Sequence, residues 1–357
     1  MMPWSDIDRL QQLGRPLHAV DLGALDGSHR SIEDLVAIGV TWRMANLAQS
    51  RLTRLTFVDC DLRGADLRGA ALDGCSFTRC DFSDTRWGGF AGNQLAFTDC
   101  DFQRSDADGA RVAMSAITRC DLRAVQWSRA SLHRSVFSQC QLDGGCFDGT
   151  LLDQTVMTDT DFRRISVTGL IANTCVLNKA CFDGMDLRTL RLDRCLLESA
   201  SFVDVDLRGV SLREANCRRA QFVRCDLRGA NLSRALLLEA GFDDIDADQL
   251  QCSGAIFQGA TLKRARFARA QASGSLWDHS RHETTSFESA DLSFAHFDHA
   301  SGSHVDLRRA NLSHASFHNV RFDPLDSRGA NVHRMSGTAP ARLAAEARAL
   351  KLEMHSC

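Results

Sequence analysis

The chain contains one short stretch that returns at a fixed spacing. Phe57-Val58-Asp59-Cys60-Asp61-Leu62 is followed by four variants of itself: Phe77-Thr78-Arg79-Cys80-Asp81-Phe82, Phe97-Thr98-Asp99-Cys100-Asp101-Phe102, Ile117-Thr118-Arg119-Cys120-Asp121-Leu122 and Phe137-Ser138-Gln139-Cys140-Gln141-Leu142. The period is 20 residues. A fixed short period is typical of a solenoid, in which each repeat packs on its neighbours.

Each of these repeats contains a finer period of five, with a small residue two positions before a large apolar one. Counting every fifth position from Trp42 to Val332 gives 59 sites, and 49 of them hold Leu, Phe, Trp, Ile, Met or Val. Neither the 3.6-residue period of a helix nor the two-residue alternation of a strand produces this pattern. A square coil does, with one pentapeptide per side and with the small and large residues both pointing inward.

The exceptions to the pattern occur in pairs. Five pentapeptides combine an oversized residue in the small row with an undersized residue in the large row: Phe90 with Gly92, Leu170 with Ala172, Ile245 with Ala247, Leu250 with Cys252, and Leu325 with Ser327. A close-packed interior requires such compensation of volume. We therefore expect both rows to share one core.

Several pentapeptides carry the sequence Ala-Asp/Asn-Leu followed by two further residues. The clearest are Ala65-Asp66-Leu67-Arg68-Gly69, Ala230-Asn231-Leu232-Ser233-Arg234, Ala290-Asp291-Leu292-Ser293-Phe294 and Ala310-Asn311-Leu312-Ser313-His314. From about residue 40 to residue 332 the chain resembles the pentapeptide-repeat family. The resemblance implies a right-handed quadrilateral β-helix, and it implies little about function because the matching residues build the scaffold.

The unbroken register predicts an all-β solenoid of about 15 coils over residues 41–335 and a rod about 70 Å long at the usual strand spacing. Residues 1–40 are expected to form an N-terminal cap. In this cap Ser5 with Asp8, and Ser31 with Asp34, have the spacing of helix starts.

Residues 336–357 are expected to form a C-terminal helix. Its apolar stripe is formed by Leu343, Ala347, Leu350 and Met354. We expect this helix to cover the last coil, and a homodimer contact through the helix is the alternative.

The composition bounds the class of protein. The formal charge is −3, from 42 basic and 45 acidic residues, which does not favour direct binding to nucleic acid. No stretch approaches 18 apolar residues, and the N-terminus has no apolar segment of a signal peptide. Nine of the 14 cysteines lie in the small inward row, so we expect reduced, buried thiols and a cytoplasmic, bacterial protein.

Outward-facing rows are where a solenoid is expected to bind a partner. Asp61, Asp81, Asp101 and Asp121 should stack in one row, either as an acidic stripe that replaces phosphates or as a solvated face. Arg188, Arg208 and Arg228 should stack beside an aspartate row. They are expected either to bind an acidic partner or to be neutralised by those aspartates.

Motifs of catalysis and metal binding are not found in the sequence. It has no nucleophile elbow, phosphate loop, dinucleotide fingerprint or zinc-binding helix motif. His279 and His299 should stack one coil apart, but a pair of histidines alone lacks further ligands. We therefore expect no enzyme activity, no cofactor and no metal.

The leading hypothesis is a non-enzymatic scaffold that presents Asp and Arg rows to another protein. A second hypothesis follows from the family resemblance, which includes proteins that mimic duplex DNA and bind DNA gyrase or topoisomerase. The near-neutral charge counts against this second hypothesis. A third hypothesis, an accessory or cargo protein of a bacterial secretion system, rests on the resemblance alone.

Overall fold

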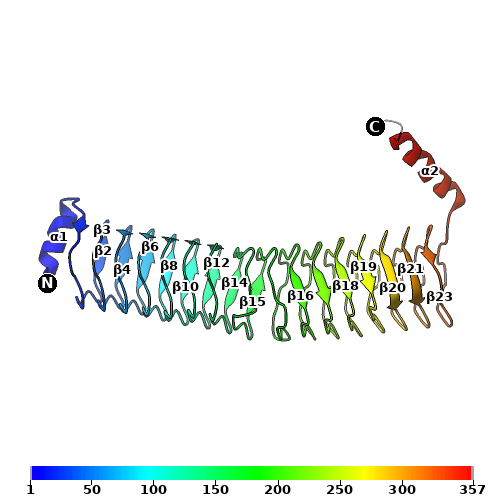
Figure 1. Ribbon diagram of the computed structural model, residues 1–357, viewed down its shortest axis with the longest axis horizontal. Helices are drawn as coiled ribbons and strands as arrows, with labels where there is room; N and C mark the ends of the chain where they lie inside the picture. Colours follow the sequence, from blue (N-terminus) through cyan, green and yellow to red (C-terminus); the bar gives the residue numbers. More distant parts are fainter. Residues whose placement is uncertain (1, 355–357) are drawn as a thin grey trace. The chain divides into compact units, whose positions relative to one another are not determined.

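The computed structural model describes residues 2–354, with side chains as far as residue 348. The chain divides into two compact units, and both are built from short parallel strands wound in coils (Figure 1). Unit 1 is Met1–Ala180 with Thr189–Arg191, and unit 2 is Cys181–Arg188 with Leu192–Cys357. Neither of the described helices is long and apolar enough to cross a membrane.

Unit 1 begins with helix α1 (Trp4–Gln12) and continues as two parallel sheets. The seven-stranded sheet has the order β1-β3-β5-β7-β9-β11-β13, and the eight-stranded sheet has the order β15-β14-β12-β10-β8-β6-β4-β2. The strands are β1 (Leu17–His18), β2 (Ser31–Glu33), β3 (Val36–Ile38), β4 (Arg51–Thr53), β5 (Thr56–Val58), β6 (Ala71–Asp73), β7 (Ser76–Thr78), β8 (Ala91–Asn93), β9 (Ala96–Thr98), β10 (Arg111–Ala113), β11 (Ala116–Thr118), β12 (Ser131–His133), β13 (Val136–Ser138), β14 (Leu151–Asp153) and β15 (Ile171–Asn173).

Unit 2 contains one parallel sheet and helix α2 (Pro340–Met354). The sheet runs in chain order from β16 to β22, and β23 pairs with β21. Its strands are β16 (Ser201–Val203), β17 (Gln221–Val223), β18 (Gly241–Asp243), β19 (Thr261–Lys263), β20 (Arg281–Ser286), β21 (Ser301–Asp306), β22 (Arg321–Phe322) and β23 (Leu325–Asp326).

The pairing register confirms the four-sided coil. Phe57 pairs with Phe77, and Phe77 pairs with Phe97, so each strand lies beside the strand one repeat later. The other two sides of the unit 1 coils are rows of isolated parallel bridges, for example Asp61 with Asp81 and Asp66 with Arg86. A repeat with four paired positions has four sides, so these coils form a quadrilateral β-solenoid, which is the predicted fold class.

The corners of the coil are formed by the residue two positions after each large inward one. This residue has a positive φ, for example 54° at Arg54, 53° at Asp59 and 66° at Gly64. Although the left-handed region favours glycine, many corners here hold Arg, Asp or Gln. The corner side chains are therefore available for contacts between coils, as when Arg79 donates to Asp59 over 2.7 Å.

The core is built from the two inward rows, as predicted. Cys60 and Leu62 represent the small and the large row, and both are buried. A Cβ atom added to Gly92 would lie 2.6 Å from Leu95 Cδ1 and 2.8 Å from Phe90 Cε2. The large residue Phe90 thus fills the space that Gly92 leaves, which supports the predicted compensation of volume within a side.

The coils start earlier than residue 41. Strand β1 pairs with β3 and strand β2 pairs with β4, so residues 31–33 form a strand and the second helix expected there is wrong. The spacing of Ser31 and Asp34 favours a helix start locally, but residues 31–33 pair with a parallel strand of the next coil instead. At the N-terminal end helix α1 lies outside the coils, and its Trp4 ring occupies the space beside Gly27.

Helix α2 does not cover the last coil, contrary to prediction. Leu325 and Val332 remain 42% and 52% exposed. The described contacts of α2 are polar and involve Asp298, His299 and His318 on the side of unit 2. The side chains of Leu350 and Met354, which were assigned to its apolar stripe, lie outside the described residues.

Candidate interaction surface

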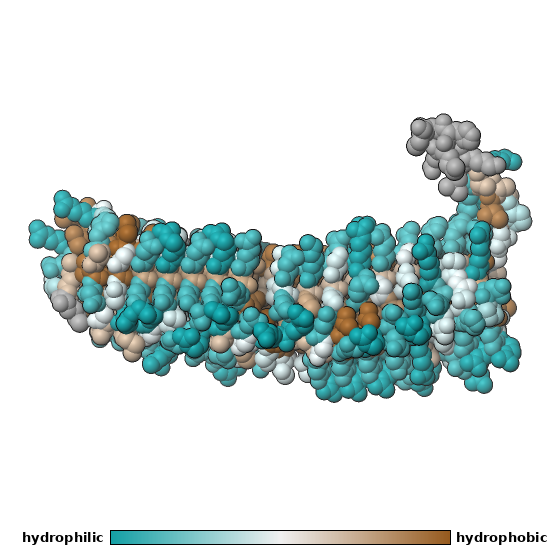
Figure 2. Space-filling view, viewed as in Figure 1, coloured by the Kyte–Doolittle hydropathy of each residue, from teal (hydrophilic) through white to brown (hydrophobic). Residues whose placement is uncertain are grey.

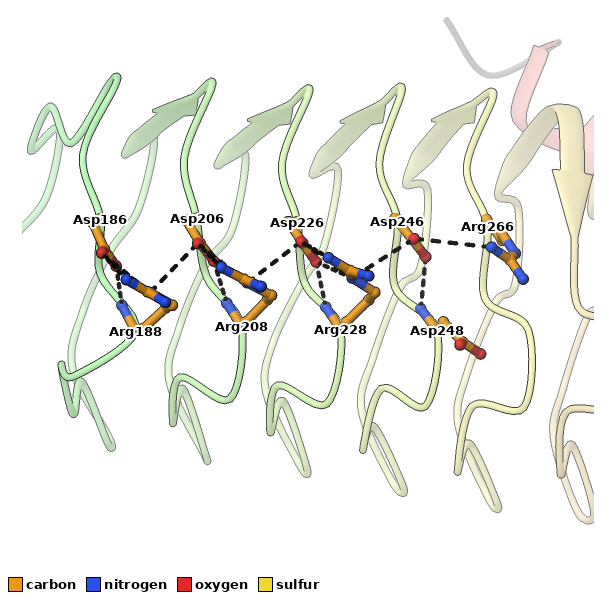
Figure 3. A network of polar contacts seen from close by, with 9 residues as sticks. All are labelled: Asp186, Arg188, Asp206, Arg208, Asp226, Arg228, Asp246, Asp248 and Arg266. Carbon is orange, nitrogen blue, oxygen red and sulfur yellow. Dashed lines mark hydrogen bonds and ion pairs between the residues drawn. The ribbon is translucent and has the colours of Figure 1, made fainter.

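Arg188, Arg208 and Arg228 stack in consecutive coils of unit 2 and are named here the arginine ladder (Figure 3). Each guanidinium forms a bidentate ion pair with the aspartate two residues before it, which is Asp186, Asp206 or Asp226. In each pair Nε donates to Oδ1 over 2.9 Å, and Nη2 donates to Oδ2 over 2.5 or 2.6 Å. The predicted pairing of the Arg row with an Asp row is thus present.

The ladder is also linked from coil to coil. Arg188 Nε lies 3.4 Å from the carboxylate of Asp206, and Arg208 Nε lies 3.6 Å from that of Asp226. The hydrogen bonds from Arg188 lower the pKa of the Asp186 carboxyl to about 2. The hydrogen bonds from Arg208 and Arg228 likewise lower the pKa of Asp206 and Asp226. The three aspartates therefore stay ionised at neutral pH, and each holds its arginine in one orientation.

The arginine side chains are nevertheless accessible. Their exposed fractions are 50% for Arg188, 42% for Arg208 and 49% for Arg228. Within the described residues their bonds to aspartate use Nε and Nη2, which leaves Nη1 for a ligand. The ladder ends at the next coil, where Asp248 occupies the equivalent position (Figure 3) and pairs with Arg269.

The predicted aspartate row of unit 1 stacks as expected, through bridges from Asp61 to Asp81, Asp101 and Asp121. It is not a free acidic stripe, because arginines lie within it. Arg63 donates to Asp61 over 2.6 Å and lies 3.4 Å from Asp81, and Arg123 donates to Asp121 over 2.5 Å. All four carboxylates are partly buried. The row therefore offers interrupted negative charge.

The cavities found in the interior of the unit 1 coils are too small for a substrate. Those between Trp87 and Trp127, and between Ile32 and Phe82, measure about 20 and 10 Å³. Such volumes hold a single water molecule at most. Figure 2 shows instead that hydrophilic side chains follow the coils in rows along the surface. The arrangement is suited to binding by an outer face.

One group of side chains was missed by sequence analysis. His279 and His299 stack as predicted, with ring centroids 4.9 Å apart. The additional partners of His299 include His318 in the following coil and Glu346 in α2. His318 falls one position short of a full repeat after His299, so a search for rows at the repeat spacing overlooks it.

The family model of pentapeptide repeats matches the chain in eight copies, with matched residues 45–84, 117–154, 191–229, 200–238 and 285–323. No curated protein matches the chain.

Among solved structures, QnrB1, a plasmid-mediated fluoroquinolone resistance protein, is 17% identical, and the match covers 51% of this chain and 91% of QnrB1 with a TM-score of 0.33. HetL, a pentapeptide repeat protein involved in heterocyst differentiation regulation from the cyanobacterium Nostoc, is 18% identical, and the match covers 94% of this chain and 95% of HetL with a TM-score of 0.20. Similarities this low support no functional argument.

Three observations agree on the family. The five-residue period, the four-sided coil with its constant register, and the matched repeats all describe the same unit of structure. The chain therefore belongs to the pentapeptide-repeat family.

Proposed function

We propose that the protein is a non-enzymatic interaction scaffold whose arginine ladder binds an acidic face of a partner protein. The observation that carries the proposal is the row of three exposed guanidiniums, each fixed by its own aspartate, at intervals of one coil. The sequence contains no catalytic motif, and the cavities inside the coils of unit 1 are too small for a substrate. The larger hollows of unit 1, of about 490 and 460 Å³, open to the surface.

The geometry of the ladder favours a regular ligand. Consecutive coils are about 4.8 Å apart, and carboxylates one turn apart on a helix are separated by about 5.4 Å. A helix with acidic residues on one face therefore matches the ladder closely. Because the aspartates already restrict the arginine side chains, binding loses less conformational freedom than it would with free arginines.

Mimicry of duplex DNA is the competing function, and the structure gives it less support. A mimic needs a continuous negative face, whereas Arg63 and Arg123 lie among the carboxylates of the aspartate row. The pairing of these charges weakens the field that a DNA-binding enzyme would meet.

The test replaces all three ladder arginines by glutamate in the full-length tagged protein. Proteins captured from the source cell are identified by mass spectrometry, and the enrichment of each is compared with that by wild type. A matched control changes Arg54, Arg79 and Arg119 to glutamate, since these are also exposed and paired with aspartates. We expect a partner that the control retains and that the ladder variant loses by about tenfold or more.

Equal capture by the ladder variant and wild type would contradict the proposal. A supercoiling assay with purified DNA gyrase tests the competing function, with Asp61, Asp81, Asp101 and Asp121 changed to Asn. We expect no inhibition by wild type. Strong inhibition that the four Asn substitutions abolish would instead establish DNA mimicry.

A further inference from the structure

Two histidines and one glutamate of unit 2 converge on a single point. His318 Nε2 lies 3.1 Å and His299 Nε2 lies 3.4 Å from the same oxygen, Oε2 of Glu346. The two rings come from consecutive coils and meet edge to face, with centroids 5.3 Å apart. Glu346 is contributed by α2, so the group joins the helix to the coils.

We propose that His299, His318 and Glu346 bind a Zn²⁺ ion that fastens α2 to the side of unit 2. Two imidazole nitrogens and one carboxylate oxygen are a donor set that suits Zn²⁺, with a fourth position open to water. All three ligand atoms lie within 4.8 Å of one another. In a tetrahedral site with bonds of about 2.0 Å, neighbouring ligand atoms are separated by about 3.3 Å, so the two distances to Oε2 already match such a site.

The surroundings orient the ligands. Arg342 donates from Nε to Oε1 of Glu346 over 2.8 Å, which leaves Oε2 for the metal. The same arginine donates from Nη1 to Oδ2 of Asp298 over 2.7 Å. Asp298 therefore offsets the charge of Arg342 near the ion. His318 is only 2% exposed, so packing restricts its ring. Such outer contacts are typical of metal sites.

The hydrogen bonds on the far sides of the rings specify how the site changes when metal binds. Ala339 donates its N–H to His318 Nδ1 over 3.1 Å, and Asn319 Nδ2 lies 3.0 Å from His299 Nδ1. Without metal, both rings therefore carry their hydrogen on Nε2 and donate it to Glu346. With Zn²⁺ on Nε2, a neutral ring carries its hydrogen on Nδ1 instead.

The two histidines differ in how they accommodate this shift. The Asn319 amide rotates and accepts the Nδ1 hydrogen of His299 through its oxygen. The N–H of Ala339 has no such option, because it is a donor only, and it must move away from His318. Metal binding thus breaks the hydrogen bond between Ala339 and His318 and attaches Glu346 more tightly. The backbone at the start of α2 moves, whereas the middle of the helix stays fixed to the coils.

The first test measures Zn²⁺ binding to the full-length protein by calorimetry, with Co²⁺ as a spectroscopic probe of coordination geometry. We expect one site per chain with a dissociation constant below about 1 μM. His299→Ala and Glu346→Gln should each weaken binding by at least about 100-fold, since even outer contacts of metal sites contribute 10- to 100-fold. Both substitutions retain every cysteine, so they separate this site from binding to thiols.

The matched control is His279→Ala. The His279 ring stacks on His299, but it lies one coil away from the ligand group, so this variant should bind Zn²⁺ as wild type does. Hydrogen exchange gives a second readout: on addition of Zn²⁺ the Ala339 amide should exchange faster, and amides near Glu346 should exchange more slowly. Absence of binding, or binding that neither His299→Ala nor Glu346→Gln changes, would overturn the proposal.

Discussion

His282 is a polar residue in the inward row that mostly holds large apolar side chains, such as Leu262 in the preceding coil. It is 2% exposed, and burial lowers its pKa to about 3 from the usual 6.5. Ser280 Oγ gives its hydrogen to Trp277 O over 2.5 Å, so Nε2 of His282 must donate to this hydroxyl over 2.7 Å. Nδ1 has no hydrogen-bond partner among the described residues. The ring is therefore neutral in the folded protein.

This histidine should make the stability of the protein depend on pH. The unfolded chain takes up a proton near pH 6.5, and the folded chain does so only near pH 3, so acid favours unfolding between these values. The contribution is about 1.4 kcal/mol per pH unit. Between pH 7 and pH 5 the free energy of unfolding of wild type should fall by about 2 kcal/mol more than that of His282→Leu.

Denaturant titrations at the two pH values measure this difference. His18→Leu is the control, because His18 is exposed on strand β1 and its removal should leave the pH dependence as in wild type. An identical loss of stability in wild type and His282→Leu would show that His282 is not buried as a neutral ring.

Single positions of the core were predictable because volume is compensated locally. The pairing of Phe90 with Gly92 follows from the sequence, and the structure confirms that the Phe90 ring lies where a side chain at Gly92 would go. The contact of Leu95 Cδ1 with the same space was not predicted, since Leu95 belongs to the next side of the coil. The five-residue pattern specifies each side of the square but not the packing at its corners.

Helix α1 is the element that closes the first coil of unit 1. Ile7 is fully buried, and the Trp4 ring lies 6.4 Å from the ring of Trp42. Ile7→Asp should destabilise unit 1 by about 3 kcal/mol, because it places an unpaired charge among apolar side chains.

Thermal unfolding followed by tryptophan fluorescence measures the effect of Ile7→Asp. Leu13→Asp is the matched control at the end of the same helix: Leu13 is 59% exposed, so the change should shift stability by less than about 0.5 kcal/mol. Equal melting temperatures of wild type and Ile7→Asp would contradict the closing role of α1.

The ends of the chain were harder to predict than its middle. Leu17, Leu22 and Ile32 continue the register toward the N-terminus, but Gly27 and Ala37 interrupt it. The Trp4 ring fills the gap at Gly27 from outside the repeat, which no periodic rule detects. Glu346 was missed for the same reason, since the position of α2 is determined by polar contacts and not by the register.

The cysteines of the whole molecule share one chemical state. The 13 described cysteines are present as thiols, and ten of them are buried. Burial raises the pKa of Cys217 and Cys252 to about 12, and that of Cys140 to about 11. Thiolates are the reactive form, so most thiols should not react while the protein is folded.

A thiol-reactive dye added to the native protein should modify Cys146 and Cys181 first among the described cysteines, because they are partly exposed. Cys140 is also partly exposed, but the raised pKa of its thiol should slow its reaction. After unfolding without reductant, all 14 thiols should react. Changing Cys146 and Cys181 to Ser should remove their share of the early reaction, whereas Cys217→Ser should not alter it. Fewer than 14 reactive thiols in the unfolded protein would reveal disulfides.

The pairing of each strand with its counterpart in the next coil restricts how the chain can change in length. Removal of one residue within the coils would move outward aspartates and arginines into the inward rows that follow. Removal of residues 71–90 would instead join Ala70 to Ala91, which occupies the same place as Ala71 in the next coil. Insertions and deletions within the coils should therefore preserve the fold only when their length is one whole coil or a multiple of it.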